Sequence, residues 1–162
     1  MESGTKIFGH AIHPILVVFP LGLLTTAVIF DAIGWATGDG KWLEIAFRLI
    51  GAGIIGGLAS ALFGLIDYQA IPSRTRAKTI GLWHGLGNVA VIILFAASWL
   101  IRWPNPHNPG ALPAMLSLSG ALLMLVTGWL GGELVERLGV GVDNGANLNA
   151  PSSLSGRPAA ER

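Results

Sequence analysis

The chain has 162 residues, of which 52% are hydrophobic and only 12% are charged, and its formal net charge is +1. Soluble domains carry about twice this share of charged residues, and a net charge so near zero gives no electrostatic basis for binding nucleic acid. The lack of cysteine excludes disulfides, a thiolate nucleophile, a cysteine-ligated iron–sulfur cluster and haem attached through cysteine. Non-covalent haem and metal sites built from histidine and carboxylate stay open.

Four long segments of the chain contain no Asp, Glu, Lys or Arg: residues 7–30, 49–66, 79–101 and 103–132. A helix needs about 20 apolar residues to cross the hydrocarbon core of a bilayer. Because backbone groups find no water there, each crossing segment is expected to be helical. The sequence therefore predicts an all-α polytopic membrane protein, a four-transmembrane-helix antiparallel bundle.

The first span is predicted over residues 14–36. Pro14 suits the first turn of a helix, and Pro20 removes one backbone hydrogen bond and should bend the span. The apolar stretch is too long for a cleavable signal, and a single lysine precedes it, so we interpret it as a retained span. A short glycine-containing loop leads to the second span, predicted over residues 42–68.

The third span is predicted over residues 80–103, after a loop that carries three basic residues. A proline-rich connection leads to the fourth span, predicted over residues 112–135. Residues 1–142 thus form the transmembrane domain. Gly, Asn, Ser and Pro dominate the rest of the chain, so residues 143–162 are predicted to form a disordered polar tail.

The basic residues predict the orientation. Lys and Arg favour cytoplasmic loops, and the middle loop holds Arg74, Arg76 and Lys78, whereas the first loop holds one basic residue and the third none. Four spans place the middle loop and both termini on one side. We therefore expect a multi-pass protein of the bacterial cytoplasmic (inner) membrane with an N-in, C-in topology.

Ionisable groups within membrane spans are costly, and they fall here into two layers. In the outer layer, Asp31 near the end of the first span and Arg48 near the start of the second are predicted to form a structural ion pair that fixes helix register. The alternative is a path for protons or ions. The inner layer gathers polar side chains from all four spans: His10, His13, Asp67, His84, Asn88 and Glu133.

The inner layer suggests a cofactor. His84 shares a helix face with Gly81, Gly85 and Asn88, which would leave room for a flat haem b with His13 or His10 as its second axial ligand. A transition metal would instead gather His10, His13, His84 and Asp67. A third interpretation of the layer needs no cofactor, because His–Asp hydrogen bonds alone could hold the helices together.

Three other members of the inner layer are predicted to support the histidines. Asp67 is placed to orient one imidazole, and Asn88 lies one turn after His84. Asp67 and Glu133 both end helices, where the helix dipole disfavours a carboxylate, so each should have a cationic or hydrogen-bond-donating partner.

Several ordered blocks resemble the DUF2231 family of small bacterial membrane proteins: His10-Ala-Ile-His13-Pro14 through Gly22, Asp31, Gly64-Leu-Ile-Asp67-Tyr68, His84 with Asn88, Gly131-Gly132-Glu133-Leu134-Val135, and Gly139-Val-Gly141-Val142. Glu136 departs from the family pattern, which often has an aromatic residue there. The resemblance implies four transmembrane helices and no established activity. Some relatives carry a Rieske-type iron–sulfur domain beside this one, which implies membrane redox chemistry.

These observations lead to three functional hypotheses. The first is a redox module that holds a haem b or a metal between spans 1 and 3 near the cytoplasmic side and passes electrons to a membrane partner or quinone. The second is a non-catalytic scaffold or assembly subunit whose His/Asp layer fixes helix packing. The third and weaker one is a small transporter subunit, for which the sequence shows no inverted repeat. The bilayer is the surrounding partner in each case, and a homo-oligomer stays open. No hydrolase constellation is present, so an enzyme acting alone is not expected.

Overall fold

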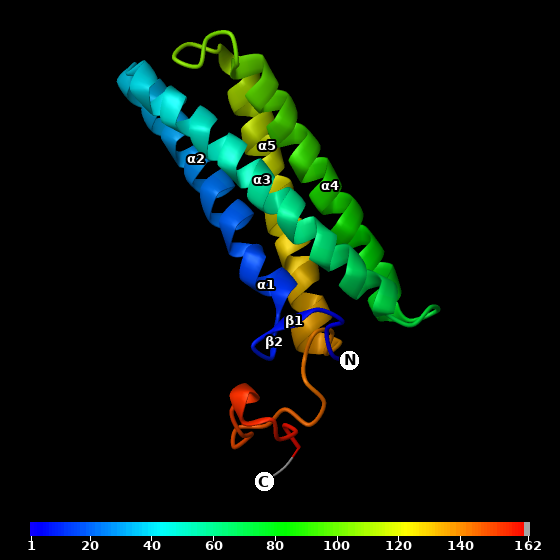
Figure 1. The fold of residues 1–162 in the computed structure, drawn as a ribbon. Helices are drawn as coiled ribbons and strands as arrows, with labels where there is room; N and C mark the ends of the chain where they lie inside the picture. Colours follow the sequence, from blue (N-terminus) through cyan, green and yellow to red (C-terminus); the bar gives the residue numbers. More distant parts are fainter. Residues whose placement is uncertain (161–162) are drawn as a thin grey trace.

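The computed structural model describes residues 1–160 and forms a bundle of four membrane-length helices (Figure 1). The first span consists of α1 (Ile12–Leu16) and α2 (Val18–Thr37), and the second is α3 (Gly40–Ala70). The third is α4 (Arg76–Arg102), and the fourth is α5 (Ala111–Gly132), which a π-helical turn, η1 (Glu133–Arg137), extends. The predicted all-α, four-helix class is confirmed. The one strand pair among these residues joins β1 (Lys6–Ile7) to β2 (His10–Ala11).

The break between α1 and α2 lies at Val17, where Pro20 predicts it. Proline has no N–H to donate to the carbonyl four residues earlier, so the Leu16 carbonyl lacks its helical partner. On either side the ladder continues, since Val17 donates to the His13 carbonyl at 3.0 Å and Leu21 donates to Val17 at 3.2 Å. The interruption is thus local, and the two pieces act as one span.

Helix α4 begins four residues before the predicted boundary. The Thr75 side chain accepts a hydrogen bond from the Lys78 backbone N–H at 3.1 Å, so Thr75 caps the helix. The basic residues assigned to a loop therefore lie partly in the first turn of α4, and the turn between α3 and α4 shortens to residues 71–75.

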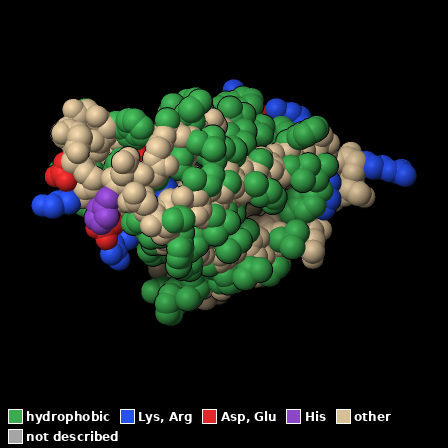
Figure 2. Space-filling view, turned by 90° about the horizontal axis from the view of Figure 1, so that it is seen from above, with side chains coloured by type: hydrophobic (Ala, Val, Ile, Leu, Met, Phe, Trp, Pro, Cys, Tyr) green, Lys and Arg blue, Asp and Glu red, His purple; other side chains and the backbone are tan. Residues whose placement is uncertain are grey.

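The interior of the bundle is small and apolar along most of its length. Its core cluster comprises Leu24, Ala27, Ala46, Ile50, Val91, Phe95 and Met124. Large apolar side chains point outward instead: Ile55, Leu62, Ile93 and Leu125 are each more than 60% exposed. Figure 2 shows hydrophobic side chains over most of the face it presents, with the charged ones toward its edges. A surface of this kind requires a bilayer around it.

Both termini lie at one end of the bundle (Figure 1). The first residues fold across this end, where the Met1 amino group donates to the Gly139 carbonyl at 2.9 Å. Residues 143–160, for which the composition predicts no fixed structure, form turns and the 3-10 helix η2 (Ser153–Ser155) below the bundle. Three contacts tie them to the N-terminal segment: the Ser153 hydroxyl donates to the Phe8 carbonyl at 3.1 Å, the Asn144 backbone donates to Glu2 at 3.1 Å, and Lys6 donates to Asp143.

Candidate histidine site

Two of the predicted inner-layer histidines meet inside the bundle. His13 comes from α1 and His84 from α4, and their ring centroids lie 6.4 Å apart with the ring planes at 88°. Both side chains are half-buried. The pairing joins the first and third spans.

Each of these imidazoles is held by a backbone carbonyl of the next membrane span in the chain. His13 Nδ1 lies 2.9 Å from the carbonyl oxygen of Ser60 in α3, and His84 Nδ1 lies 2.8 Å from that of Thr127 in α5. A carbonyl oxygen can only accept, so Nδ1 carries the proton in both rings. In a neutral imidazole held in this way the lone pair is on Nε2.

Glycines make room for both rings. A Cβ added at Gly64 would lie 2.9 Å from His13 Nδ1, and one added at Gly131 would lie 3.1 Å from His84 Cε1. Real Cβ contacts are rarely this close, so either added methyl would press on the imidazole. Gly85, on the face predicted to receive a haem, has nothing within 4 Å of its Cβ position.

Asn88 joins the site on the side of His84. Its Nδ2 donates to the His84 carbonyl at 2.9 Å and lies 3.2 Å from His84 Nε2. The Thr127 hydroxyl lies 3.1 Å from Asn88 Oδ1, an arrangement that keeps the amide nitrogen toward the ring. The amide nitrogen is also 3.5 Å from His84 Nδ1, so it lies over the ring face and is not directed at the in-plane lone pair of Nε2.

The remaining inner-layer residues lie apart from the pair. His10 is exposed in β2, where its Nδ1 is 3.1 Å from the Phe8 carbonyl. Asp67 accepts from the Ser3 hydroxyl at 2.6 Å and the Gly4 backbone at 3.0 Å, so it holds the N-terminal segment instead of an imidazole.

Glu133 pairs with Arg76 at 2.7 Å, again away from the histidines. Over residues 1–160 no three His, Asp or Glu side chains gather closely enough to hold a metal. The structure thus brings His13, His84 and Asn88 together and leaves the compact four-ligand arrangement with His10 and Asp67 unassembled.

The predicted Asp31–Arg48 ion pair is wrong. Asp31 pairs with Arg102 of α4, which donates to both carboxylate oxygens at 2.6 Å, and the two side chains are 5% and 0% exposed. Arg48 lies on the outer surface of α3, 72% exposed, and pairs with Glu44 one turn earlier at 2.5 Å. The prediction failed because it compared depth along neighbouring helices, whereas helix rotation decides which side chain faces inward.

Buried serine hydroxyls surround the Asp31–Arg102 pair and form hydrogen bonds with it and with one another. Arg102 Nε donates to the Ser98 hydroxyl at 3.1 Å, and the Ser98 and Ser117 hydroxyls lie 2.8 Å apart. Ser98 also donates to the Pro113 carbonyl at 2.8 Å. Nearly all the polar groups around Asp31 therefore find partners within the bundle, as a dry interior requires.

The sequence analysis missed Ser60 and Thr127, whose carbonyls hold the histidines. A usable signal exists, because each is a small hydroxyl residue four positions before a glycine that seats an imidazole, Gly64 or Gly131. In a membrane helix this spacing marks a face where another element approaches closely.

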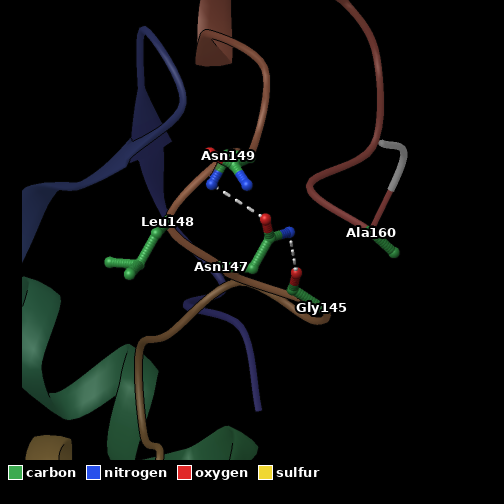
Figure 3. Close-up of a pocket in the computed structure, with 5 residues that line it drawn as sticks. All are labelled: Gly145, Asn147, Leu148, Asn149 and Ala160. Carbon is green, nitrogen blue, oxygen red and sulfur yellow. Dashed lines mark hydrogen bonds between the residues drawn. The ribbon is translucent and has the colours of Figure 1, made fainter.

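Two hollows on the molecular surface lie away from the histidines. One of about 750 Å³ is formed by the tail and lined by Gly145, Asn147, Leu148, Asn149 and Ala160 (Figure 3). Asn147 donates from Nδ2 to the Gly145 carbonyl there, and its Oδ1 accepts from the Asn149 backbone. The lining has no titratable group. A second hollow, of about 300 Å³, lies at the opposite end beside Gly34 and His107.

Comparison with known proteins gives a family match and little else. The family described as "Predicted membrane protein (DUF2231)" matches residues 9–144. Neither the curated proteins nor the solved structures give a match to this chain.

Proposed function

The chain belongs to the DUF2231 family of predicted membrane proteins, and on this premise we propose that it is a membrane redox module holding a haem b, or a transition metal ion, between His13 and His84. The observation that carries the proposal is the pair itself, with rings 6.4 Å apart and each Nδ1 anchored on a carbonyl. Histidines that bind metals almost always donate their other ring N–H in this way, which fixes the tautomer and the ring orientation.

The separation of the rings suits two ligands on opposite sides of one metal. Metal–nitrogen bonds of about 2.0–2.1 Å on both sides would place the ring centres about 6 Å apart. The observed 6.4 Å is close to this value. The Asn88 amide lies over the His84 ring, so it does not occupy the in-plane Nε2 lone pair that a ligand would take.

The small number of protein ligands favours haem over a bare ion. Protein sites for single metal ions usually supply three or four ligands, whereas the described residues offer two imidazoles here. A tetrapyrrole brings four nitrogens of its own and needs only the two axial positions filled. A bare ion would depend on water or a partner for its other ligands.

Charge at the two ends supports the proposed orientation. The end that holds both termini carries Arg74, Arg76, Lys78 and Arg137. The opposite end carries Lys41 and Arg48, while Arg102 is buried against Asp31. We therefore propose N-in and C-in topology in the bacterial cytoplasmic membrane. The histidines then lie near the cytoplasmic side, where a membrane partner or quinone would exchange electrons with the cofactor.

A scaffold without cofactor is the second candidate, and one observation favours it. The imidazoles, Asp31, Arg102, Ser98 and Ser117 all have hydrogen-bond partners within the chain. Polar networks that are satisfied in this way can fix helix packing by themselves.

The deciding experiment is the absorption spectrum of protein purified from haem-supplemented cells, oxidised and reduced, with elemental analysis of the same sample. We expect a Soret band with reduced α and β bands. His13→Ala and His84→Ala should each abolish it, whereas His10→Ala and His107→Ala should retain it. A bound transition metal without haem would select the second form of the proposal. Colourless, metal-free protein would overturn the proposal and favour the scaffold.

A further inference from the structure

The two halves of the bundle carry the same buried face in the same register. Hairpin 1 is defined as residues 12–70 and hairpin 2 as residues 76–137. Buried positions in the first helix of each hairpin correspond at an offset of 71, the separation of Asp31 and Arg102. Those in the second helix correspond at an offset of 67, as from Gly53 to Gly120. The matching buried residues are Pro20, Leu24, Ala27 and Asp31 with Val91, Phe95, Ser98 and Arg102, and Ala46, Ile50, Gly53 and Ser60 with Pro113, Ser117, Gly120 and Thr127.

The contacts within each hairpin repeat at the same offsets. His13 bonds to the Ser60 carbonyl and His84 to its equivalent, the Thr127 carbonyl. Gly64 seats the first imidazole, and its equivalent, Gly131, seats the second.

A third contact repeats near the middle of the bundle. A Cβ at Gly53 would meet Leu24 at 2.5 Å, and a Cβ at Gly120 would meet Phe95 at 2.8 Å. Phe95 is the equivalent of Leu24. Contacts at two separate depths of the bundle therefore agree on one correspondence, so the two hairpins are structural repeats.

Equivalent residues also meet one another across the bundle. His13 faces its equivalent, His84, and Asp31 bonds to its equivalent, Arg102. In a two-fold arrangement a residue contacts its own equivalent only where both lie beside the axis. A pseudo-two-fold axis therefore runs along the bundle between both pairs. Parallel repeats about an axis along the membrane normal are known in other membrane proteins.

Charge breaks this symmetry at one buried place. The imidazoles on the axis are alike, but Asp31 and Arg102 carry opposite charges. If hairpin 1 paired with hairpin 1 of a second copy, two Asp31 carboxylates would meet in the interior. If hairpin 2 paired with hairpin 2, two Arg102 guanidinium groups would meet. Each arrangement buries like charges without a counter-ion, which is strongly unfavourable.

We propose that the Asp31–Arg102 pair is the specificity determinant of this interface, which lets hairpin 1 pair with hairpin 2 and rejects the like hairpin of a second copy of this chain. Like-hairpin pairing is a real competitor, because both hairpins bury equivalent positions beside the axis. Specificity of this kind commonly comes from an element that penalises the wrong partner. The inference needs no cofactor and stands apart from the proposed redox function.

The test uses full-length chains in membranes and a thiol cross-link as reporter, since the natural chain has no cysteine. With His13→Cys as background, pairing of like hairpins places two thiols on either side of the axis, and a short bifunctional thiol reagent then joins two chains. We compare an intact pair, the reversed pair Asp31→Arg/Arg102→Asp, the apolar pair Asp31→Leu/Arg102→Met, and Glu44→Gln/Arg48→Gln as a matched exposed pair. Folding is verified by circular dichroism in each case.

The apolar pair should raise cross-linked dimers several-fold, whereas the intact, reversed and exposed-pair chains should stay at background. A folded apolar-pair variant at background would overturn the proposal. A second measurement covers misfolding of that variant: a chain with Asp31→Arg and a chain with Arg102→Asp, carrying different tags, are produced together. Their hairpins should exchange, so the two tags should co-purify. Two differently tagged copies of the same variant chain should not co-purify. Loss of this mixed complex would also overturn the proposal.

Discussion

The guanidinium of Arg102 spans the bundle and donates one hydrogen bond to each carboxylate oxygen of Asp31, both at 2.6 Å. Neither side chain reaches the surface, since Arg102 is 0% exposed and Asp31 is 5% exposed. This fork arrangement is the geometry in which arginine binds carboxylates most tightly. It also lies about 27 Å from His13 along the first span, at a rise of about 1.5 Å per residue. The bundle thus has one polar pair near each end and an apolar core between them.

Removing one partner of this buried pair should be far more damaging than removing Arg48. Arg102→Ala would leave the Asp31 carboxylate buried without its cation, at a cost of about 3–5 kcal/mol in unfolding free energy. Arg48→Ala removes only an exposed pair with Glu44 and should cost about 0–1 kcal/mol. Thermal unfolding in detergent, followed by circular dichroism, measures both. Equal losses for the two variants would contradict the arrangement described.

The fold could be predicted from the sequence because any segment that crosses the bilayer must be helical, so a long run of uncharged residues by itself locates each span. Four uncharged segments can only be helices there, and the boundaries agree within about four residues at every span. The largest miss, at Arg76, has a local cause: Thr75 caps α4 and draws basic residues into its first turn. Such a cap is hard to recognise in a polar loop rich in other hydroxyl and basic groups.

The candidate site was predictable only in part. That His13 and His84 share a depth can be found by counting residues, but that they face each other depends on helix rotation. For the same reason the wrong partner was predicted for Asp31, which pairs with Arg102, 71 residues later in the sequence. Asp67 matched the depth of the histidines but binds Ser3 and Gly4, because the N-terminal segment folds back over the bundle end. Composition gives no sign of that fold-back.

The internal repeat could not be recognised from the sequence, for a different reason. Few residues are identical between the halves, and the offset falls from 71 to 67 because α2 and α3 extend further at the loop end of hairpin 1 than α4 and α5 do in hairpin 2. What the halves share is a pattern of burial, and burial becomes visible only when the helices are packed.

Glycine-to-alanine substitutions should separate the glycines that seat the imidazoles from those on open faces. Gly64→Ala and Gly131→Ala place a methyl 2.9 Å and 3.1 Å from ring atoms of His13 and His84. Overpacking of this kind costs about 1–3 kcal/mol. Gly22→Ala and Gly85→Ala meet nothing within 4 Å and should keep or slightly raise stability, because alanine favours helix.

Thermal unfolding of the four variants gives the comparison. A matched test of ring placement is the histidine side-chain NMR signal, which should shift only in the Gly64 and Gly131 variants. Equal behaviour of all four would mean that the glycines do not hold the rings.

Ligand-free protein should contain both site histidines as the Nδ1–H tautomer. The Ser60 and Thr127 carbonyls can accept only from a protonated Nδ1, at 2.9 and 2.8 Å. The His10→Ala/His107→Ala variant leaves only His13 and His84, so its ¹⁵N NMR spectrum can be assigned directly. Each ring should show a protonated Nδ1 and an unprotonated Nε2. A protonated Nε2 in either ring would remove its lone pair and weaken the case for metal binding at that residue.

Contact between the tail and the N-terminal segment should depend on pH through Glu2 and Lys6, both outside the spans. Lys6 donates to Glu2 at 2.8 Å and also to Asp143 of the tail, while the Asn144 backbone donates to Glu2 at 3.1 Å. The hydrogen bond from Lys6, and then that from Asn144, lowers the pKa of Glu2. The bonds to Asp143 and Glu2 raise the pKa of Lys6.

These directions determine the pH range in which the contact is stable. A lowered carboxyl pKa stabilises the contact above the ordinary glutamate pKa of about 4.3, and this contribution is lost as the pH falls through the lowered value. A raised lysine pKa stabilises the contact below pH about 10.4, and this contribution is lost as the pH rises through the raised value.

A spin label introduced by Leu154→Cys should therefore be restrained between these limits and become mobile in acid. Lys6→Met should free the label at neutral pH, whereas Lys41→Met, at the other end of the bundle, should leave it restrained. A label equally mobile at every pH would show that the contact does not hold the tail.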